Sequence, residues 1–399
     1  MRRWMTVGAL AALGLAGCDD GGQASPALEL AADAGAGGAG AAGGTGGAGG
    51  AGGAGGEVPP DCSPTEGGVH GTLYTDSDGS DASFYLAGMG EADASAQLAV
   101  HLLGAEGEVA LRTCADGRYT SEALADGVYL SFADVADGAR CASRNCPGRF
   151  ARAVAAGQVT VVTFGDSIAV IGDAPMFPAR FATLLGPLAQ VDNRNVAVAG
   201  STSDQWVPGA RYYERNLAPE LADADLILIT LGGNDIMRYA NNPALFNDLP
   251  GAVAGAEEVV LQVIANLTAT IQGIREVNAD ADIAYVLYPN YTQAEDDIMW
   301  RTVTRVLGQE AVEGVLELAR SSFPDEIDDH LLFVDMFSAA DGLPLDDYLY
   351  DQLHFNDAGQ QLYAESVFES LGGVLVGPSP LGAQGATPLG LTRHFGLAP

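Results

Sequence analysis

The chain has 399 residues and a formal net charge of −34, with 18 lysine and arginine residues against 52 acidic ones. None of the basic residues is a lysine, which excludes a serine–lysine dyad, a Walker-type lysine and a pyridoxal Schiff base, since each needs an ammonium group. A surface with this much negative charge repels the phosphate backbone of nucleic acids, and we therefore expect no nucleic-acid partner.

The amino-terminal residues have the composition of an export signal. Arg2 and Arg3 precede an apolar run from Val7 to Ala16, which is too short to span a bilayer as a helix. The run ends in Leu-Ala-Gly-Cys at Cys18, which resembles the bacterial lipobox, where the cysteine is lipidated after cleavage. We predict a signal peptide at 1–17, lipidation of Cys18 and attachment to a cell-envelope membrane, at the periplasm or the cell surface. The alternative is an ordinary secretory signal with an incidental cysteine.

Residues 18–61 hold the lipid-anchor cysteine and a segment rich in glycine and alanine, which predicts a flexible tether. Four further cysteines follow: Cys62, Cys114, Cys141 and Cys146. An even number in an exported chain predicts two disulfides, and four cysteines allow three pairings. Of these we favour Cys62–Cys114 with Cys141–Cys146. Zinc is not expected, because the cysteines show no paired spacing with nearby histidines.

The sequence of residues 62–157 predicts a small β domain. Two Asp-Gly turn signals, at Asp116 and Asp126, each lead into a run typical of a strand. The second run alternates apolar and polar residues over 128–132, the period of a half-buried strand. The segment from Thr113 to Phe132 resembles carboxypeptidase-regulatory, transthyretin-like β-sandwich modules, which implies an accessory role.

From Val159 onward, strand-like runs alternate with helical patterns. The expected strands are Val159–Phe164, Asn195–Ala199, Leu226–Leu231, Ile283–Tyr288 and Leu331–Val334. Helical patterns cover Ala252–Val277, Asp297–Ser321 and Asp357–Leu371. This alternation predicts an α/β domain at 158–376, with a parallel sheet covered on both faces, and an irregular tail at 377–399. In such sheets function gathers at the carboxyl ends of the strands.

Three short motifs follow the first three of these strands. Ser167 closes Gly-Asp-Ser, Gly200 follows the second strand, and Asn234 closes Gly-Gly-Asn. Taken singly, each has an ordinary reading as a helix cap, a turn glycine or a loop residue. Together they offer an exposed serine hydroxyl, and beside it a close backbone N–H and an amide donor of the kind that an oxyanion site needs.

The fourth motif lies near the carboxyl terminus. Asp351 and His354 stand three positions apart in a short loop before the last helix. At that spacing the carboxylate can orient one imidazole nitrogen and leave the other for a serine hydroxyl. The chain has no Gly-x-Ser-x-Gly elbow, which counts against the α/β-hydrolase alternative.

In order and placement, the four motifs resemble the four blocks of the SGNH (GDSL-like) hydrolases, over about 159–371. The resemblance implies a three-layer α/β/α flavodoxin-like domain. It also implies Ser167 as nucleophile, His354 as general base and Asp351 as its orienting acid. The oxyanion hole would hold donors from Ser167, Gly200 and Asn234. Asp166 and Asp235 beside them are interpreted as residues that brace the loops.

The implied activity is serine-dependent hydrolysis of carboxylic esters through an acyl-enzyme, with no metal or organic cofactor. The resemblance admits small esters, lipid esters and O-acyl groups on glycans as substrates, and the accessory module favours extracellular polymers. The competing hypothesis is a surface-tethered binding protein with a catalytically silent hydrolase domain. The sequence does not determine the oligomeric state.

Overall fold

The structure is a computed structural model, and it describes residues 63, 65, 67–72, 98–114, 116–135, 148–240, 249–294 and 331–382. Cys18, Cys62, Cys141, Cys146 and the predicted helix at 297–321 lie outside these residues. The signal peptide, the lipidation and the cysteine pairing therefore stay predictions. Within the described part of the chain, no helix is long and apolar enough to cross a membrane.

The amino-terminal strands form antiparallel sheets. Their bounds are β1 (His70–Thr72), β2 (Leu98–Gly104), β3 (Gly107–Val109), β4 (Leu111–Thr113), β5 (Arg118–Ser121) and β6 (Gly127–Val135). One sheet has the order β1-β5-β4, and the other has the order β12-β6-β2-β3, where β12 is Gly373–Val376. The Asp-Gly turn at Asp116 closes the β4–β5 hairpin, and its Gly117 has φ +85°. This turn was predicted from its sequence.

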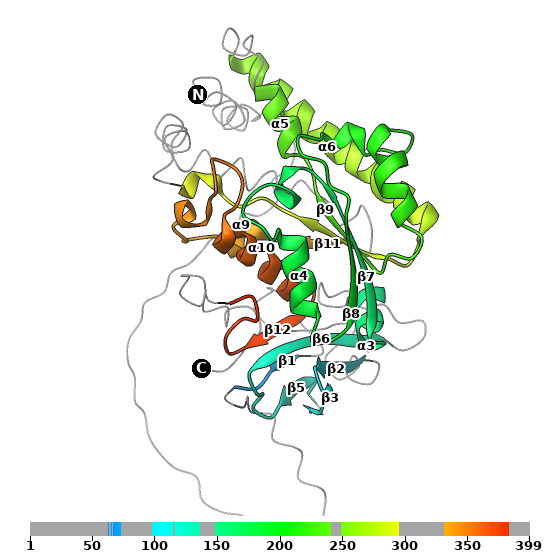
Figure 1. Cartoon of the computed structure of the whole chain (residues 1–399), viewed down its shortest axis with the longest axis vertical. Helices are drawn as coiled ribbons and strands as arrows, with labels where there is room; N and C mark the ends of the chain where they lie inside the picture. Colours follow the sequence, from blue (N-terminus) through cyan, green and yellow to red (C-terminus); the bar gives the residue numbers. More distant parts are fainter. Residues whose placement is uncertain are drawn as a thin grey trace, which may run out of the picture.

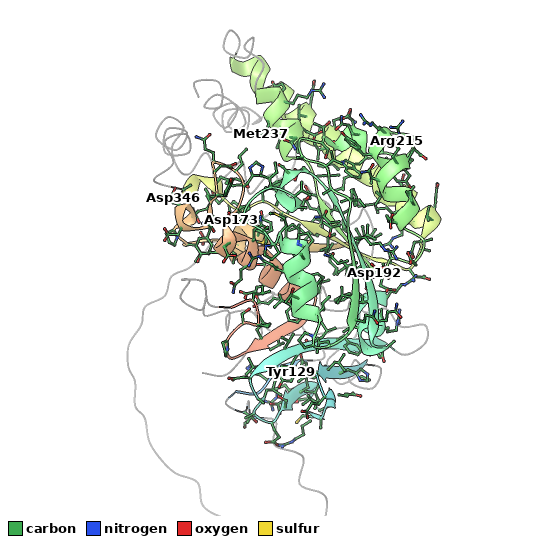
Figure 2. All side chains as sticks on the ribbon, viewed as in Figure 1. Tyr129, Asp173, Asp192, Arg215, Met237 and Asp346 are labelled. Atoms are coloured by element: carbon green, nitrogen blue, oxygen red, sulfur yellow. The ribbon has the colours of Figure 1, made fainter. Side chains whose placement is uncertain are left out.

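The strand predicted over 128–132 is part of β6, but it is buried on both faces and not half-buried. Val128, Leu130 and Phe132 on one face join the core beside the α/β domain, while Tyr129 and Ser131 on the other face are buried too. The polar groups on this second face are satisfied by backbone carbonyl oxygens, since the Ser131 hydroxyl donates a 3.0 Å hydrogen bond to Gly372 and the Tyr129 hydroxyl a 2.9 Å hydrogen bond to Ala125. Figure 2 labels Tyr129 on this strand.

The remaining strands form a five-stranded parallel sheet. They are β7 (Gln158–Gly165), β8 (Gln190–Asn195), β9 (Leu226–Thr230), β10 (Asp282–Val286) and β11 (Leu331–Val334), in the order β11-β10-β9-β7-β8. Read from the other edge, this is the second, first, third, fourth and fifth strand, the order of a flavodoxin-like sheet. The predicted fold class is confirmed.

Helices and helical turns connect these strands. They are α3 (Arg149–Ala155), η1 (Ser167–Ala169), α4 (Phe177–Leu185), η2 (Ser203–Gln205), η3 (Tyr213–Leu217), η4 (Ala218–Glu220), α5 (Gly233–Ala240), α6 (Leu249–Val277), η6 (Tyr291–Gln293), α9 (Met336–Ala339), η7 (Leu345–Tyr348) and α10 (Asp357–Ser370). Figure 1 shows α4 and α10 on one side of the parallel sheet and α6 on the other. The sheet therefore lies between two helical layers.

The two faces of the sheet belong to two separate hydrophobic cores. On β7, Val159 and Val161 pack with α4 and α10, whereas Val162 and Phe164 pack with α6 and η3. The same alternation holds on β9 and β10. A strand with both faces buried reads as a continuous apolar run, which is why these strands were predictable.

The predicted position of the second strand of the parallel sheet was wrong. Asn195–Ala199 was expected, but β8 is Gln190–Asn195, and the residues after it form a loop. β8 is the edge strand, and its polar composition suits the solvent-exposed edge, where Arg194 pairs with Asp192 and Asp223. The valines that suggested a strand instead belong to the loop, and Val196 donates a 2.8 Å hydrogen bond to the carbonyl oxygen of Thr163 in β7.

The strand β12 was not predicted, and it joins the two halves of the chain. It pairs antiparallel with β6, so that Gly373 lies opposite Leu130 and Val376 opposite Gly127. The core on the α4 and α10 side likewise includes residues of β6. The domain boundary predicted between residues 157 and 158 stays a prediction. The hydrogen bonds between β6 and β12 nevertheless join residues on its two sides.

Candidate active site

Ser167 is the first residue of η1, two residues after the end of β7. The N–H of Asp166 donates a 2.7 Å hydrogen bond to the carbonyl oxygen of Thr230 in β9. A Cβ on Gly165, which has φ +130°, would lie 2.0 Å from that same oxygen, so the close approach requires glycine. The serine turn is therefore fastened to the carboxyl edge of the sheet.

Gly200 lies in an exposed turn of the loop after β8, with φ +76°. The hydroxyl of the next residue, Ser201, donates a 2.9 Å hydrogen bond to the carbonyl oxygen of Gly165. The same hydroxyl accepts a 2.9 Å hydrogen bond from the buried indole of Trp206. These bonds hold the Gly200 turn against the end of the strand that carries Ser167.

Asn234 lies in the first turn of α5, after β9. Its side-chain amide donates a 3.0 Å hydrogen bond to the carbonyl oxygen of Ser201, which orients the amide toward the Gly200 turn. An amide nitrogen carries two hydrogens, so one remains for another acceptor. Asp235 accepts hydrogen bonds from the Ser203 N–H at 3.0 Å and the Ser203 hydroxyl at 2.7 Å, in agreement with its interpretation as a loop brace.

Asp351 and His354 make the contact that their spacing predicts. Nδ1 of His354 lies 2.7 Å from Oδ2 of Asp351. The other carboxylate oxygen accepts 2.8 Å hydrogen bonds from the N–H groups of Leu353 and His354. Partial burial acts to raise the pKa of Asp351, but the hydrogen bonds from His354 and Leu353 outweigh it and lower the pKa below its usual value. The carboxylate is thus ionised and oriented toward one ring nitrogen.

The segment after Ser167 is bonded to the residue after His354. Gly172 forms a parallel β-bridge with Phe355, and a Cβ on Gly172 would lie 2.1 Å from the Phe355 carbonyl oxygen. Among the described residues no hydrogen bond joins the Ser167 hydroxyl to His354. Such bonds are often long without substrate and tighten when it binds. The structure therefore brings together the loops of the two residues.

The sequence reasoning missed Tyr288. This hydroxyl donates a hydrogen bond to Oδ2 of Asp166 and accepts one of 3.1 Å from the N–H of Gly233. Burial raises the pKa of Asp166 to about 6, although hydrogen bonds from Tyr288 and Ile168 and the nearby His354 act against the rise. The sequence could have indicated Tyr288, because the fourth predicted strand ended at this tyrosine and functional groups gather at the carboxyl ends of parallel strands.

Five of the residues singled out from sequence therefore lie on neighbouring segments that contact one another: Ser167, Gly200, Asn234, Asp351 and His354. The model of the GDSL-like lipase/acylhydrolase family matches residues 163–362, a span that holds all five. The chain belongs to this family. The match supports the prediction of an ester hydrolase.

Solved structures of lipases and esterases are similar to about half of the chain. A lipase from a goat rumen metagenome is 16% identical with a TM-score of 0.41, covering 53% of this chain and 97% of its own. Phospholipase A1 from Streptomyces albidoflavus is 17% identical with a TM-score of 0.42, covering 53% of this chain and 99% of its own. Both identities are too low to indicate a substrate. Comparison with curated proteins finds no match.

Proposed function

We propose that this acylhydrolase cleaves carboxylic esters through a covalent acyl-enzyme on Ser167. The observation that carries the proposal is the 2.7 Å contact between Nδ1 of His354 and Oδ2 of Asp351. A histidine held in this way keeps the other ring nitrogen, Nε2, as the proton acceptor. The family match supports the same reaction class.

In the first half-reaction, the Ser167 oxygen attacks the ester carbonyl carbon while Nε2 of His354 takes the hydroxyl proton. The carbonyl oxygen becomes an oxyanion, stabilised by the N–H groups of Ser167 and Gly200 and by the Asn234 amide. When the ester bond breaks, the alcohol leaves with the proton from His354. Water, deprotonated by the same nitrogen, then attacks the acyl carbon of the acyl-enzyme. The bond from this carbon to the Ser167 oxygen breaks, His354 returns the proton to that oxygen, and the carboxylic acid leaves.

No step of this reaction uses a metal or an organic cofactor, because the base, the nucleophile and the oxyanion donors are all groups of the protein. The negative charge of Asp351 stabilises the imidazolium that forms after each proton transfer.

We further propose that the enzyme is exported and held at a membrane of the cell envelope by lipidated Cys18, with residues 18–61 as anchor and tether. The support is the sequence of the first 18 residues. The β-sandwich predicted at 62–157 would act as an accessory module, and O-acyl groups on extracellular glycans would join small and lipid esters as substrates. Cys18→Ala should move the protein to the soluble fraction. Membrane association that survives a high-salt wash would refute the anchor.

Labelling with a fluorophosphonate tests the nucleophile. The full chain should be labelled at one serine and Ser167→Ala should not, while the far-ultraviolet circular dichroism of the two stays equal. A panel of acyl esters of increasing chain length, with an acetylated glycan included, then defines the substrate class. A folded chain that neither reacts with the probe nor cleaves any ester would instead indicate the silent binding protein.

A further inference from the structure

The hydroxyl of Tyr288 lies between two loops that the proposed mechanism uses. On one side it donates a hydrogen bond to Asp166, the residue directly before the nucleophile Ser167. On the other side it accepts a 3.1 Å hydrogen bond from the N–H of Gly233, the residue directly before Asn234. One side chain, two residues after the end of β10, thus connects the serine turn to the start of α5.

The surroundings leave this hydroxyl little freedom. A Cβ on Gly233 would lie 3.0 Å from the Tyr288 hydroxyl oxygen, so any larger residue at this position would crowd the tyrosine. Asp166 is 2% exposed, and its other carboxylate oxygen accepts a 3.1 Å hydrogen bond from the N–H of Ile168, within η1. Both partners of the tyrosine are therefore fixed.

We propose that Tyr288 and Asp166 act as a positioning pair that sets the separation between the Ser167 oxygen and the oxyanion donor Asn234. This inference rests on the proposed function. Neither residue touches the reacting atoms. They act by holding the residues that do, and a displacement of about 1 Å at reacting groups can cost roughly 10²-fold in rate.

The positioning pair depends on the charge of Asp166. The carboxylate accepts two hydrogen bonds when it is ionised, and protonation would convert one oxygen to a donor. Burial raises the pKa of Asp166 to about 6, and the hydrogen bond from Tyr288 is the largest influence that lowers it. The titratable groups that act on the pKa of Asp166 are Tyr288, His354 and Asp235. The charge of Asp166 in turn raises the pKa of Tyr285, Tyr291 and Tyr363, which do not act on Asp166. Loss of the tyrosine hydroxyl would therefore raise the pKa of Asp166 further.

The experiment compares Tyr288→Phe with Tyr363→Phe in the full chain, with p-nitrophenyl acetate as substrate and acetate release as the readout. Tyr363 is the matched control, because its ring is buried and its hydroxyl has no hydrogen-bond partner among the described residues. Tyr288→Phe should lower kcat by about 10- to 100-fold with KM changed less than about threefold. It should also move the acidic limb of the kcat profile to higher pH. Tyr363→Phe should leave both unchanged.

Asp166→Asn and Ser167→Ala complete the set. Asp166→Asn should lower kcat as Tyr288→Phe does, and the double variant should lose no more than the worse single one, because both act through one contact. A wild-type kcat and pH profile in Tyr288→Phe, with only a lower thermal midpoint, would overturn the inference and leave the proposed function standing. Full activity in Ser167→Ala would overturn the proposed function itself.

Discussion

The backbone N–H of Asp173 donates a 3.2 Å hydrogen bond to the carbonyl oxygen of Phe355. The side chain of Asp173 (labelled in Figure 2) also accepts a 3.3 Å hydrogen bond from the N–H of Asp357, at the start of α10. Because Phe355 follows His354 directly, these bonds join the segment after the serine to the segment after the histidine as one hydrogen-bonded unit. The separation of Ser167 and His354, the proposed nucleophile and base, is thus constrained by backbone contacts that neither side chain makes.

Gly172→Ala should disrupt the backbone contact between the segment after Ser167 and Phe355. The added Cβ would lie 2.1 Å from the Phe355 carbonyl oxygen, and φ is +134°, so the two loops must separate. We expect kcat to fall by at least about 10-fold, since reacting groups shift by a sizeable fraction of 1 Å or more. Gly209→Ala is the matched control, because Gly209 has φ +85° but open space around its Cβ position. It should lose stability by about 1 kcal/mol through backbone strain alone, without a change in kcat. Equal kinetic effects of the two variants would contradict the argument.

Asp351→Asn should lower kcat, but less than His354→Ala does. The carboxylate orients the imidazole and stabilises its charged form, whereas the imidazole itself transfers the proton; loss of such an acid costs about 10⁴-fold in a well-studied serine protease. Asp347→Asn removes an exposed carboxylate from the same region and should have no kinetic effect. The kcat values of all three variants, measured by steady-state kinetics and compared with that of the wild type, test this prediction. An Asp351→Asn variant with the wild-type kcat would mean that another group orients His354.

Asn234→Ala should lower kcat by about 10²–10³-fold and change KM little, because the tetrahedral oxyanion accepts a stronger hydrogen bond than the ester carbonyl does. Asn266→Ala is the control. Asn266 donates a 2.9 Å hydrogen bond to the Ser203 hydroxyl, so it braces the same loop without a place in the oxyanion hole. It should lower the thermal midpoint and leave kcat per folded molecule within about twofold. If Asn234→Ala behaves as Asn266→Ala does, the oxyanion role of Asn234 is refuted.

Local sequence was enough to predict the structure of strands that are buried on both faces and of turns whose own residues contact one another. The continuous apolar run of β9 and the Asp-x-x-His loop are such cases, since the contact between Asp351 and His354 needs only four neighbouring residues. Edge strand β8 was misplaced because it is polar, and its Arg194 pairs with Asp192 in the same strand and with Asp223, which lies outside the strand further along the chain. Tyr288 and β12 were missed because their partners stand more than fifty residues away.

Glu369, near the end of α10, should make stability fall as pH rises. Burial, and to a lesser extent the charge of Glu365, raise its pKa from 4.5 to about 8. Between these two values the folded protein binds more protons at Glu369 than the unfolded chain does. Ionisation of this group therefore costs folding free energy, and stability declines through this window. At 1.36 kcal/mol for each pKa unit, the cost above pH 8 is at most roughly 5 kcal/mol.

Glu369→Gln removes that cost. The free energy of unfolding, measured in urea at several pH values, should be higher in the variant at pH 9 and nearly equal to that of the wild type at pH 4. Asp166 contributes a trend of the same sign between its usual pKa of 3.8 and about 6, but it does so in both proteins, so their difference isolates Glu369. The catalytic rate should not change, since Glu369 lies twelve residues after Asp357, which is about 18 Å along the helix. A stability difference that is the same at both pH values would show that Glu369 does not titrate between them.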